Sequence, residues 1–264
     1  MKKIKILKIH GERGEATEDL LAEEVALRLF IEHRAVVTLL CTPENLEDLL
    51  FGFLFTSDLI RNTEDVKKIT IDRKSWSAHI EIHHGFDESQ APSYNTVIGS
   101  GCGNLLTFAS VRSSSSSFQV ESAGPLLSTL QIEKLMESLK GRAIIHKETG
   151  GVHSAALANP DEILVFREDI GRHNAVDKVV GNYLLSDKNF SDTILITSGR
   201  ITSEILSKAE KCGISVIISR SAPTDKSVLR ARETGMTLIG FARRNRLNIY
   251  SGERRIIQSP LRAK

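Results

Sequence analysis

The chain has 264 residues and a hydrophobic content of 41%, which supports a sizeable core and argues against intrinsic disorder. Its formal net charge is only +2, so no strong overall field attracts it to nucleic acid or to a membrane surface. No apolar run is long enough to span a bilayer, and the three cysteines are too widely spaced for a disulfide framework. This pattern is typical of a protein from a reducing cytoplasm.

Residues 1–95 are predicted to form a small α+β domain. The first ten residues alternate basic and apolar types, which indicates an amphipathic strand and not a signal peptide. A helix is expected to begin with Thr42 as its N-cap and Pro43 at its first position. Four further strands are expected at 25–31, 36–41, 69–71 and 76–82.

A polar stretch at 85–95 marks the expected boundary, and residues 96–264 are predicted to form a larger α/β domain. A capping box, Ser128-x-x-Gln131, opens a helix that Gly141 is expected to close. Strands and helices then alternate, and the strands are continuous apolar runs, as in a sheet covered by helices on both faces. The expected elements are strands at 163–166, 193–197, 214–219, 237–241 and 247–250, and helices after Gly171, at 203–211 and at 225–234.

The segment 168–178, E-D-I-G-R-H-N-A-V-D-K, lies where a predicted strand gives way to a predicted helix. Ligands of open α/β sheets bind at that edge, and a helix N-terminus there attracts anions. The competing interpretation is a capped helix with a solvated cluster of charges. We favour a binding edge because the same arrangement recurs along the chain.

Four more polar clusters follow or precede predicted strands, at 149–153, 197–200, 219–224 and 241–246. Hydroxyls, glycines and arginines on one rim suit a ligand with phosphates and pterin- or purine-like rings. In the last cluster Arg243 and Arg246 are expected to pair with phosphates, and Phe241 to stack on a ring. Each arginine taken alone is also compatible with an ordinary solvated surface charge.

Cys102 lies in the loop G-S-G-C-G-N, whose three glycines leave the thiol sterically open. The alternative is a small residue tolerated in a tight turn. Cys41 and Cys212 are expected to be inert packing residues. His153 and His173 are candidate zinc ligands by residue type, but no partners occur at zinc-site spacing, so no metal site is predicted. A run of five serines, 113–117, is predicted to form a mobile loop.

Six motifs together resemble the FdhD family, the sulfur carrier proteins required for formate dehydrogenase activity. They are T-G-G-V-H-S-A, E-D-I-G-R-H-N-A-V-D-K, T-S-G-R-I-T-S-E, S-x-S-A-P-T, F-A-R-x-x-R-L-N-I-Y and the N-terminal T-P-E-N-L-E-D-L-L-F-G-F-L. The resemblance covers most of the chain. It implies a three-layer α/β/α cytidine deaminase-like domain with a mixed sheet beside the smaller N-terminal α+β domain, without deaminase chemistry. The P-C-x-x-C signature of zinc deaminases is absent from the sequence, in agreement with that expectation.

The resemblance also implies a function. Family members take sulfur from a cysteine desulfurase as a persulfide and pass it to the molybdenum cofactor, a bis(guanine dinucleotide), which then enters formate dehydrogenase. The persulfide cysteine maps onto Cys102, and a homodimer is implied. The family's cofactor-binding segment maps onto Phe241, Ala242, Arg243, Arg244, Asn245 and Arg246.

The chain departs from the family at one point. Many members carry a C-x-x-C pair, but here Cys102 is followed by Gly103, Asn104 and Leu105. A mechanism with a resolving thiol is therefore in doubt, whereas a single-cysteine carrier remains possible. Two other functions compete with this one. A cysteine-dependent hydrolase would use His153 or His173 as its base. A non-catalytic chaperone would bind the cofactor or formate dehydrogenase without needing Cys102.

Overall fold

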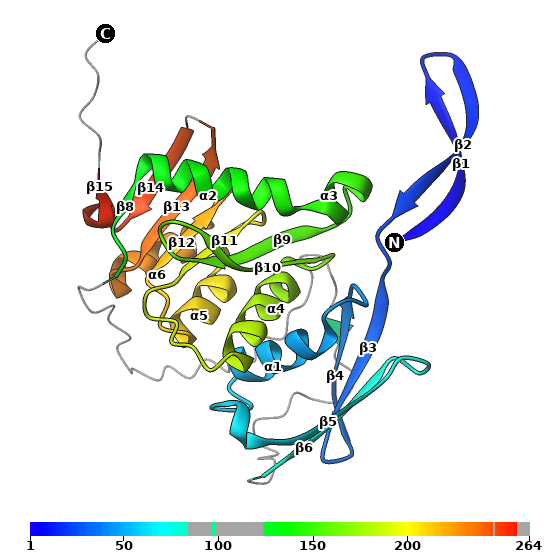
Figure 1. Cartoon of the computed structure of the whole chain (residues 1–264), viewed down its shortest axis with the longest axis horizontal. Helices are drawn as coiled ribbons and strands as arrows, with labels where there is room; N and C mark the ends of the chain where they lie inside the picture. The colour runs from blue at the N-terminus through cyan, green and yellow to red at the C-terminus, as the bar shows by residue number, and fades with distance from the viewer. Residues whose placement is uncertain (84–96, 99–123, 245, 258–264) are drawn as a thin grey trace.

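A computed structural model describes residues 1–83, 97–98, 124–244 and 246–257 of the chain (Figure 1). The predicted boundary at 85–95, the Cys102 loop, the serine run 113–117 and Asn245 lie outside these described residues. The predicted mixed α/β class is confirmed. The cytidine deaminase-like layering and the division near residue 95 stay predictions.

The N-terminal part begins with a hairpin that extends away from the body of the molecule (Figure 1). Its two strands, β1 (Lys2–His10) and β2 (Arg13–Leu21), pair in an unbroken antiparallel register. The first strand thus confirms the prediction from the alternating pattern. Within the described residues, a second sheet has the order β5-β6-β3-β4-β7. Its strands are β3 (Val25–Ile31), β4 (Arg34–Cys41), β5 (Val66–Asp72), β6 (Ser77–Ile82) and β7 (Val97–Ile98), and a 3-10 helix (Thr63–Asp65) precedes β5.

Helix α1 (Leu46–Thr56) begins later than predicted, and the assignment of Thr42 as its cap is wrong. Asn45 is the N-cap, in a left-handed backbone conformation with φ of 53°. Thr42 is buried, and both its N–H and its hydroxyl donate to the carboxylate of Asp169. Because these groups serve a tertiary contact, they are not available to cap the helix.

The larger sheet has, in the described residues, the strand order β10-β9-β11-β12-β13-β14. The strands β11, β12 and β13 are mutually parallel, whereas β9, β10 and β14 run antiparallel to their neighbours, so the sheet is mixed. Their bounds are β9 (His153–Ala158), β10 (Ile163–Asp169), β11 (Ile194–Thr197), β12 (Val216–Ser219), β13 (Thr237–Arg243) and β14 (Arg246–Ser251). A short parallel pair joins β8 (Leu127–Ser128) to β15 (Ile256–Ile257), and a 3-10 helix (Glu253–Arg255) precedes β15.

Helices lie on both sides of this sheet (Figure 1). The helix α2 (Thr129–Arg142) packs on one face, and α4 (Arg172–Leu185), α5 (Ser203–Lys211) and α6 (Asp225–Thr234) pack on the other. The capping box of Ser128 and Gln131 is confirmed. The prediction that Gly141 closes α2 is wrong, because Gly141 stays helical. A second helix, α3 (Ile144–Thr149), follows, and the left-handed Gly150 (φ 66°) ends it. No helix among the described residues is long and apolar enough to cross a membrane.

The N-terminal sheet is joined to the larger sheet through the crossing of α1 and α4. At this crossing the two backbones touch. A Cβ atom on Gly52 would lie 1.8 Å from the carbonyl oxygen of Asp177, and one on Gly181 would lie 1.9 Å from that of Asp48. One apolar core therefore runs from β3 and β4 through α1 and α4 to the large sheet.

Candidate functional site

The polar clusters predicted from the sequence meet at one edge of the large sheet. Parallel strands β11, β12 and β13 all end there. Strand β9 is antiparallel to β11, so it begins at the same edge, where His153 is opposite Asp169 at the end of β10. The predicted common rim is thus confirmed for the described residues.

A cavity of about 410 Å³ opens at this rim, and we call it the rim pocket. All five predicted polar segments contribute to its wall, and the segment 168–178 contributes Ile170. Its lining residues are His146, Gly150, Gly151, Val152, His153, Ile170, Ser198, Arg220, Ser221 and Arg243. This lining, taken over the described part of the chain, holds two arginines and no carboxylate, so the pocket favours an anionic ligand.

Two histidines, His146 and His153, line the rim pocket. The Nδ1 atom of His146 lies 2.9 Å from the carbonyl oxygen of Val152 and must donate to it, because a carbonyl only accepts. The Nδ1 atom of His153 lies 3.5 Å from the hydroxyl of Ser198, which in turn accepts the N–H of Ser154 at 2.9 Å. Burial lowers the pKa of His153, and the nearby Arg172 lowers it further. This histidine is therefore neutral at neutral pH.

Glu168 holds His146 in place. Its two carboxylate oxygens accept the backbone N–H groups of Ile145 and His146, each at 2.9 Å, in the first turn of α3. A carboxylate is favourable at a helix N-terminus because it satisfies free N–H groups. His146 was not predicted as a site residue, because an isolated histidine in a helix carries no pattern that marks it as a pocket residue.

The described residues of the segment 241–246 lie in three environments, and Arg243 lines two of them, the rim pocket and a smaller hollow beside α2. Arg243 lines the rim pocket and donates from Nε to the carbonyl of Arg220 at 3.1 Å. Ala242 is buried in the core beneath α2. Arg244 and Arg246 line a much smaller hollow beside α2, and the guanidinium of Arg246 lies 5.4 Å from the ring centroid of Phe241.

The backbone of this segment is strained at two positions. Phe241 has φ of 52° and Arg244 has φ of 45°, in the left-handed region that a bulky side chain rarely adopts. A register shift between Gly240 and Arg243 interrupts the pairing of β13 with β14 here. Arg244 is the first of the two residues between the paired Arg243 and Arg246, a position where a tight hairpin turn requires a positive φ.

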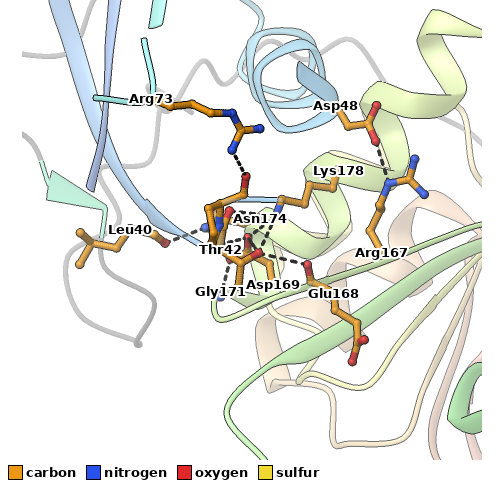
Figure 2. A network of polar contacts seen from close by, with 11 residues as sticks. Leu40, Thr42, Asp48, Arg73, Arg167, Glu168, Asp169, Gly171, Asn174 and Lys178 are labelled. Carbon is orange, nitrogen blue, oxygen red and sulfur yellow. Dashed lines mark hydrogen bonds and ion pairs between the residues drawn. The ribbon is translucent and has the colours of Figure 1, made fainter. Parts of the chain in front are cut away.

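Much of the segment 168–178 serves the interior instead of the rim (Figure 2). Asp169 and Lys178 are fully buried and form an ion pair at 2.7 Å. Asp169 also accepts from the N–H of Gly171 at 2.8 Å and from the side-chain amide of Asn174 at 3.0 Å. Lys178 donates to the hydroxyl of Thr42 at 2.7 Å. These contacts connect the end of β4 to α4. The segment was predicted to be either a ligand-binding edge or a capped helix with solvated charges, and neither prediction included this buried network.

His173 lies near the rim but is held by a neighbouring helix. Its Nε2 atom is 3.1 Å from a carboxylate oxygen of Glu204 in α5. Burial lowers the pKa of His173, although the contact with Glu204 opposes that shift. No group of three or more potential metal ligands occurs among the described side chains.

Cys41 and Cys212 are buried, as predicted for packing residues. Burial, together with the charge of Asp169, raises the pKa of Cys41 to about 12. Burial also raises the pKa of Cys212 strongly. Neither thiol is available as a thiolate near neutral pH. Cys102 lies outside the described residues, so its reactivity stays a prediction.

The structure is thus that of an α/β protein with a pocket at the edge of its large sheet, and the described lining of this pocket carries two arginines and no carboxylate. Comparison with known proteins gives the family. The FdhD/NarQ family model matches residues 22–257, and the chain belongs to that family.

Curated relatives cover almost the whole chain. Sulfur carrier protein FdhD of Bacillus subtilis (strain 168) is 37% identical over 254 residues, which is 93% of this chain and 94% of the relative. The protein of the same name from Listeria monocytogenes serotype 4b (strain F2365) is 38% identical over 255 residues, with 96% and 97% covered. A crystal structure of a protein from Desulfotalea psychrophila has a TM-score of 0.76 at 23% identity, with 97% and 99% covered, and supports the fold alone.

Proposed function

We propose that this protein is a sulfur carrier that serves formate dehydrogenase. It accepts sulfur from a cysteine desulfurase as a persulfide on Cys102 and passes it to the molybdenum cofactor, in its bis(guanine dinucleotide) form, before the cofactor enters the enzyme. The relatives named sulfur carrier protein support the sulfur-carrying role. The observation that carries the cofactor part is the rim pocket, whose described lining contains two arginines and no acid.

The rim pocket has the chemistry for one guanine nucleotide end of the cofactor. Its volume of about 410 Å³ lies within the usual range for small-molecule sites. Arg220 and Arg243 would bind phosphate oxygens, and the hydroxyls of Ser198 and Ser221 would add hydrogen bonds. The neutral ring of His153 can donate or accept at the edge of a base, because a neutral imidazole has one nitrogen of each kind.

Sulfur loading requires a free thiolate, and burial of the two described cysteines leaves Cys102 as the candidate. In this step the Cys102 thiolate attacks the outer sulfur of the desulfurase persulfide. The S–S bond of the donor breaks, its cysteine leaves as a thiolate, and Cys102 becomes the persulfide, with no net oxidation or reduction. Cys41 and Cys212 are excluded from this step by burial.

Formate oxidation in a strain that lacks its own carrier tests this function. We expect Cys102→Ser to abolish formate oxidation while the purified variant still folds and binds guanosine diphosphate. Cys212→Ala, which removes a buried thiol, is the matched control and should support formate oxidation. Normal formate oxidation with Cys102→Ser would reject sulfur transfer and favour a chaperone that only binds the cofactor or the enzyme.

Calorimetry with guanosine diphosphate tests the pocket. Charge-assisted hydrogen bonds contribute about 1.5–3 kcal/mol each, so Arg220→Ala combined with Arg243→Ala should weaken binding by about 100-fold or more. Arg61→Ala removes an exposed arginine outside the rim pocket and should bind normally. Equal affinity in all three proteins would reject the rim pocket as the nucleotide site.

A further inference from the structure

Helix α3 joins the fold without burying a side chain of its own. None of the residues Ile144–Thr149 is buried, although packing of a buried face is what holds most helices in place. Two of its side chains bond within the same stretch of chain: Lys147 donates to the carbonyl of Gly141, and the His146 ring donates to that of Val152. The position of α3 therefore depends mainly on its two ends and on polar contacts with the sheet.

The carboxylate of Glu168 supplies such a contact. Its two oxygens accept the backbone N–H groups of Ile145 and His146, each at 2.9 Å. Glu168 is itself buried and belongs to β10, which is paired with β9. Its side chain points away from the network around Asp169, whose buried ion pair holds the next residue of the strand (Figure 2). Glu168 thus connects a firmly held strand to a lightly held helix.

Helix α3 and the turn after it form one wall of the rim pocket. His146, Gly150, Gly151 and Val152 all line the pocket. Gly150 ends α3 in the left-handed conformation, so the course of the turn follows from the place where the helix ends. A shift of α3 would therefore move both the ring of His146 and the backbone of the turn. Glu168 does not belong to the described lining, so it would act on the pocket through α3 and not by contact with a ligand.

We propose that Glu168 is a positioning residue for the nucleotide site in the rim pocket. By holding the first turn of α3, it keeps this wall in the shape that accepts the ligand. A protein whose wall is in place for only a fraction of the time binds its ligand more weakly by that fraction. The inference rests on the proposed function, because the guanine nucleotide is the ligand of that proposal.

A simple effect of charge predicts the opposite change in affinity. Glu168 is an acid bonded to the backbone of a pocket residue, and the pocket is lined by Arg220 and Arg243. Its negative charge repels an anionic ligand, so removal of the charge alone should tighten nucleotide binding. Loss of positioning should weaken binding instead. The direction of the change therefore distinguishes a positioning role from a purely electrostatic one.

Calorimetry with guanosine diphosphate tests the proposal. Glu168→Gln keeps the length of the side chain, but its amide NH₂ cannot accept a hydrogen bond from the second N–H group. Glu168→Asp keeps the charge and is one methylene shorter, so it should lose at least one of the two bonds. We expect each variant to raise the dissociation constant at least about 10-fold, as the loss of one charge-assisted hydrogen bond implies.

The matched control is Asp65→Asn. The carboxylate of Asp65 also accepts two backbone N–H groups, those of Arg61 and Asn62. It lies in the 3-10 helix before β5 and outside the described lining of the rim pocket. This variant should therefore bind guanosine diphosphate as the wild type does.

Hydrogen exchange without nucleotide separates positioning from a loss of the fold. At short labelling times, residues 144–149 should exchange faster in both Glu168 variants, and α4 should be unchanged. Nucleotide binding as tight as in the wild type, or tighter, would overturn the positioning role and leave the proposed nucleotide site intact. Unchanged exchange at 144–149, or faster exchange throughout α4 as well, would also overturn it. A wild type that binds no guanosine diphosphate would reject the proposed nucleotide site and this inference with it.

Discussion

Replacing Asp169 by asparagine tests whether the segment 168–178 is structural at its centre. Asp169 and Lys178 are both fully buried, and their charged atoms lie 2.7 Å apart. The substitution removes the negative charge and leaves the ammonium of Lys178 without its counter-charge. The lysine would keep the hydroxyl and the carbonyl of Thr42 as acceptors, but any contact with the asparagine oxygen would be to a neutral group.

The magnitude follows from the contacts of the carboxylate. Breaking a buried ion pair by removing one partner costs about 3–5 kcal/mol. The carboxylate also accepts four hydrogen bonds, from the N–H and hydroxyl of Thr42, from Gly171 and from Asn174. An asparagine side chain has a single amide oxygen, which offers only half of those acceptor sites. We therefore expect Asp169→Asn to lose about 4 kcal/mol of unfolding free energy, a large share of the roughly 5–15 kcal/mol typical of a protein.

Urea unfolding measures this loss, and a second substitution isolates its cause. Adding Lys178→Met removes the unpaired charge, so the double variant should be more stable than Asp169→Asn alone. Lys67→Ala is the control, because it breaks an exposed pair with Glu81 at 3.5 Å and should cost less than about 1 kcal/mol. A loss below about 1 kcal/mol for Asp169→Asn would refute the reasoning.

Three further predictions concern packing, pH and thiols. Gly181→Ala should lower the unfolding free energy by about 3 kcal/mol, because its methyl group would meet the backbone at the α1–α4 crossing. Gly141→Ala, in open space within α2, should instead raise the unfolding free energy by up to about 1 kcal/mol. Equal urea midpoints for the two variants would contradict this. Burial lowers the pKa of His153 from 6.5, so the unfolded chain binds the proton more readily and the unfolding free energy should fall as pH drops below about 6.5; His153→Gln should reduce that dependence. Cys41 and Cys212 should react with iodoacetamide only after unfolding, and rapid labelling of either in the native protein would contradict their burial.

Local signals were enough to predict several elements. The helices at 203–211 and 225–234 were predicted with the observed bounds. The apolar spacing of a helix and the residues that start and end it are local features of the sequence, so they can be recognised without the fold. In the second of these, Thr224 caps the start and the left-handed Gly235 ends the helix. The common rim was also predictable, since parallel strands end at the same edge of a sheet.

Contacts between distant segments were not predictable in the same way. A threonine before a proline is a good helix cap, but Thr42 donates hydrogen bonds to Asp169, which is 127 residues away in the chain. Asp169 and Lys178 look like surface charges in the sequence, and only the fold shows that they are buried together. Gly141 resembles a helix stop, but α2 includes it and ends one residue later, at Arg142.

The most direct test of the central claim is mass spectrometry of the protein after incubation with a cysteine desulfurase and cysteine. The account predicts that one sulfur atom is added to the peptide that contains Cys102, and that peptides containing Cys41 or Cys212 stay unchanged. The added sulfur should be removed by a reductant, as expected for a persulfide. Labelling of Cys212 in place of Cys102, or no labelling of Cys102 at all, would contradict the account.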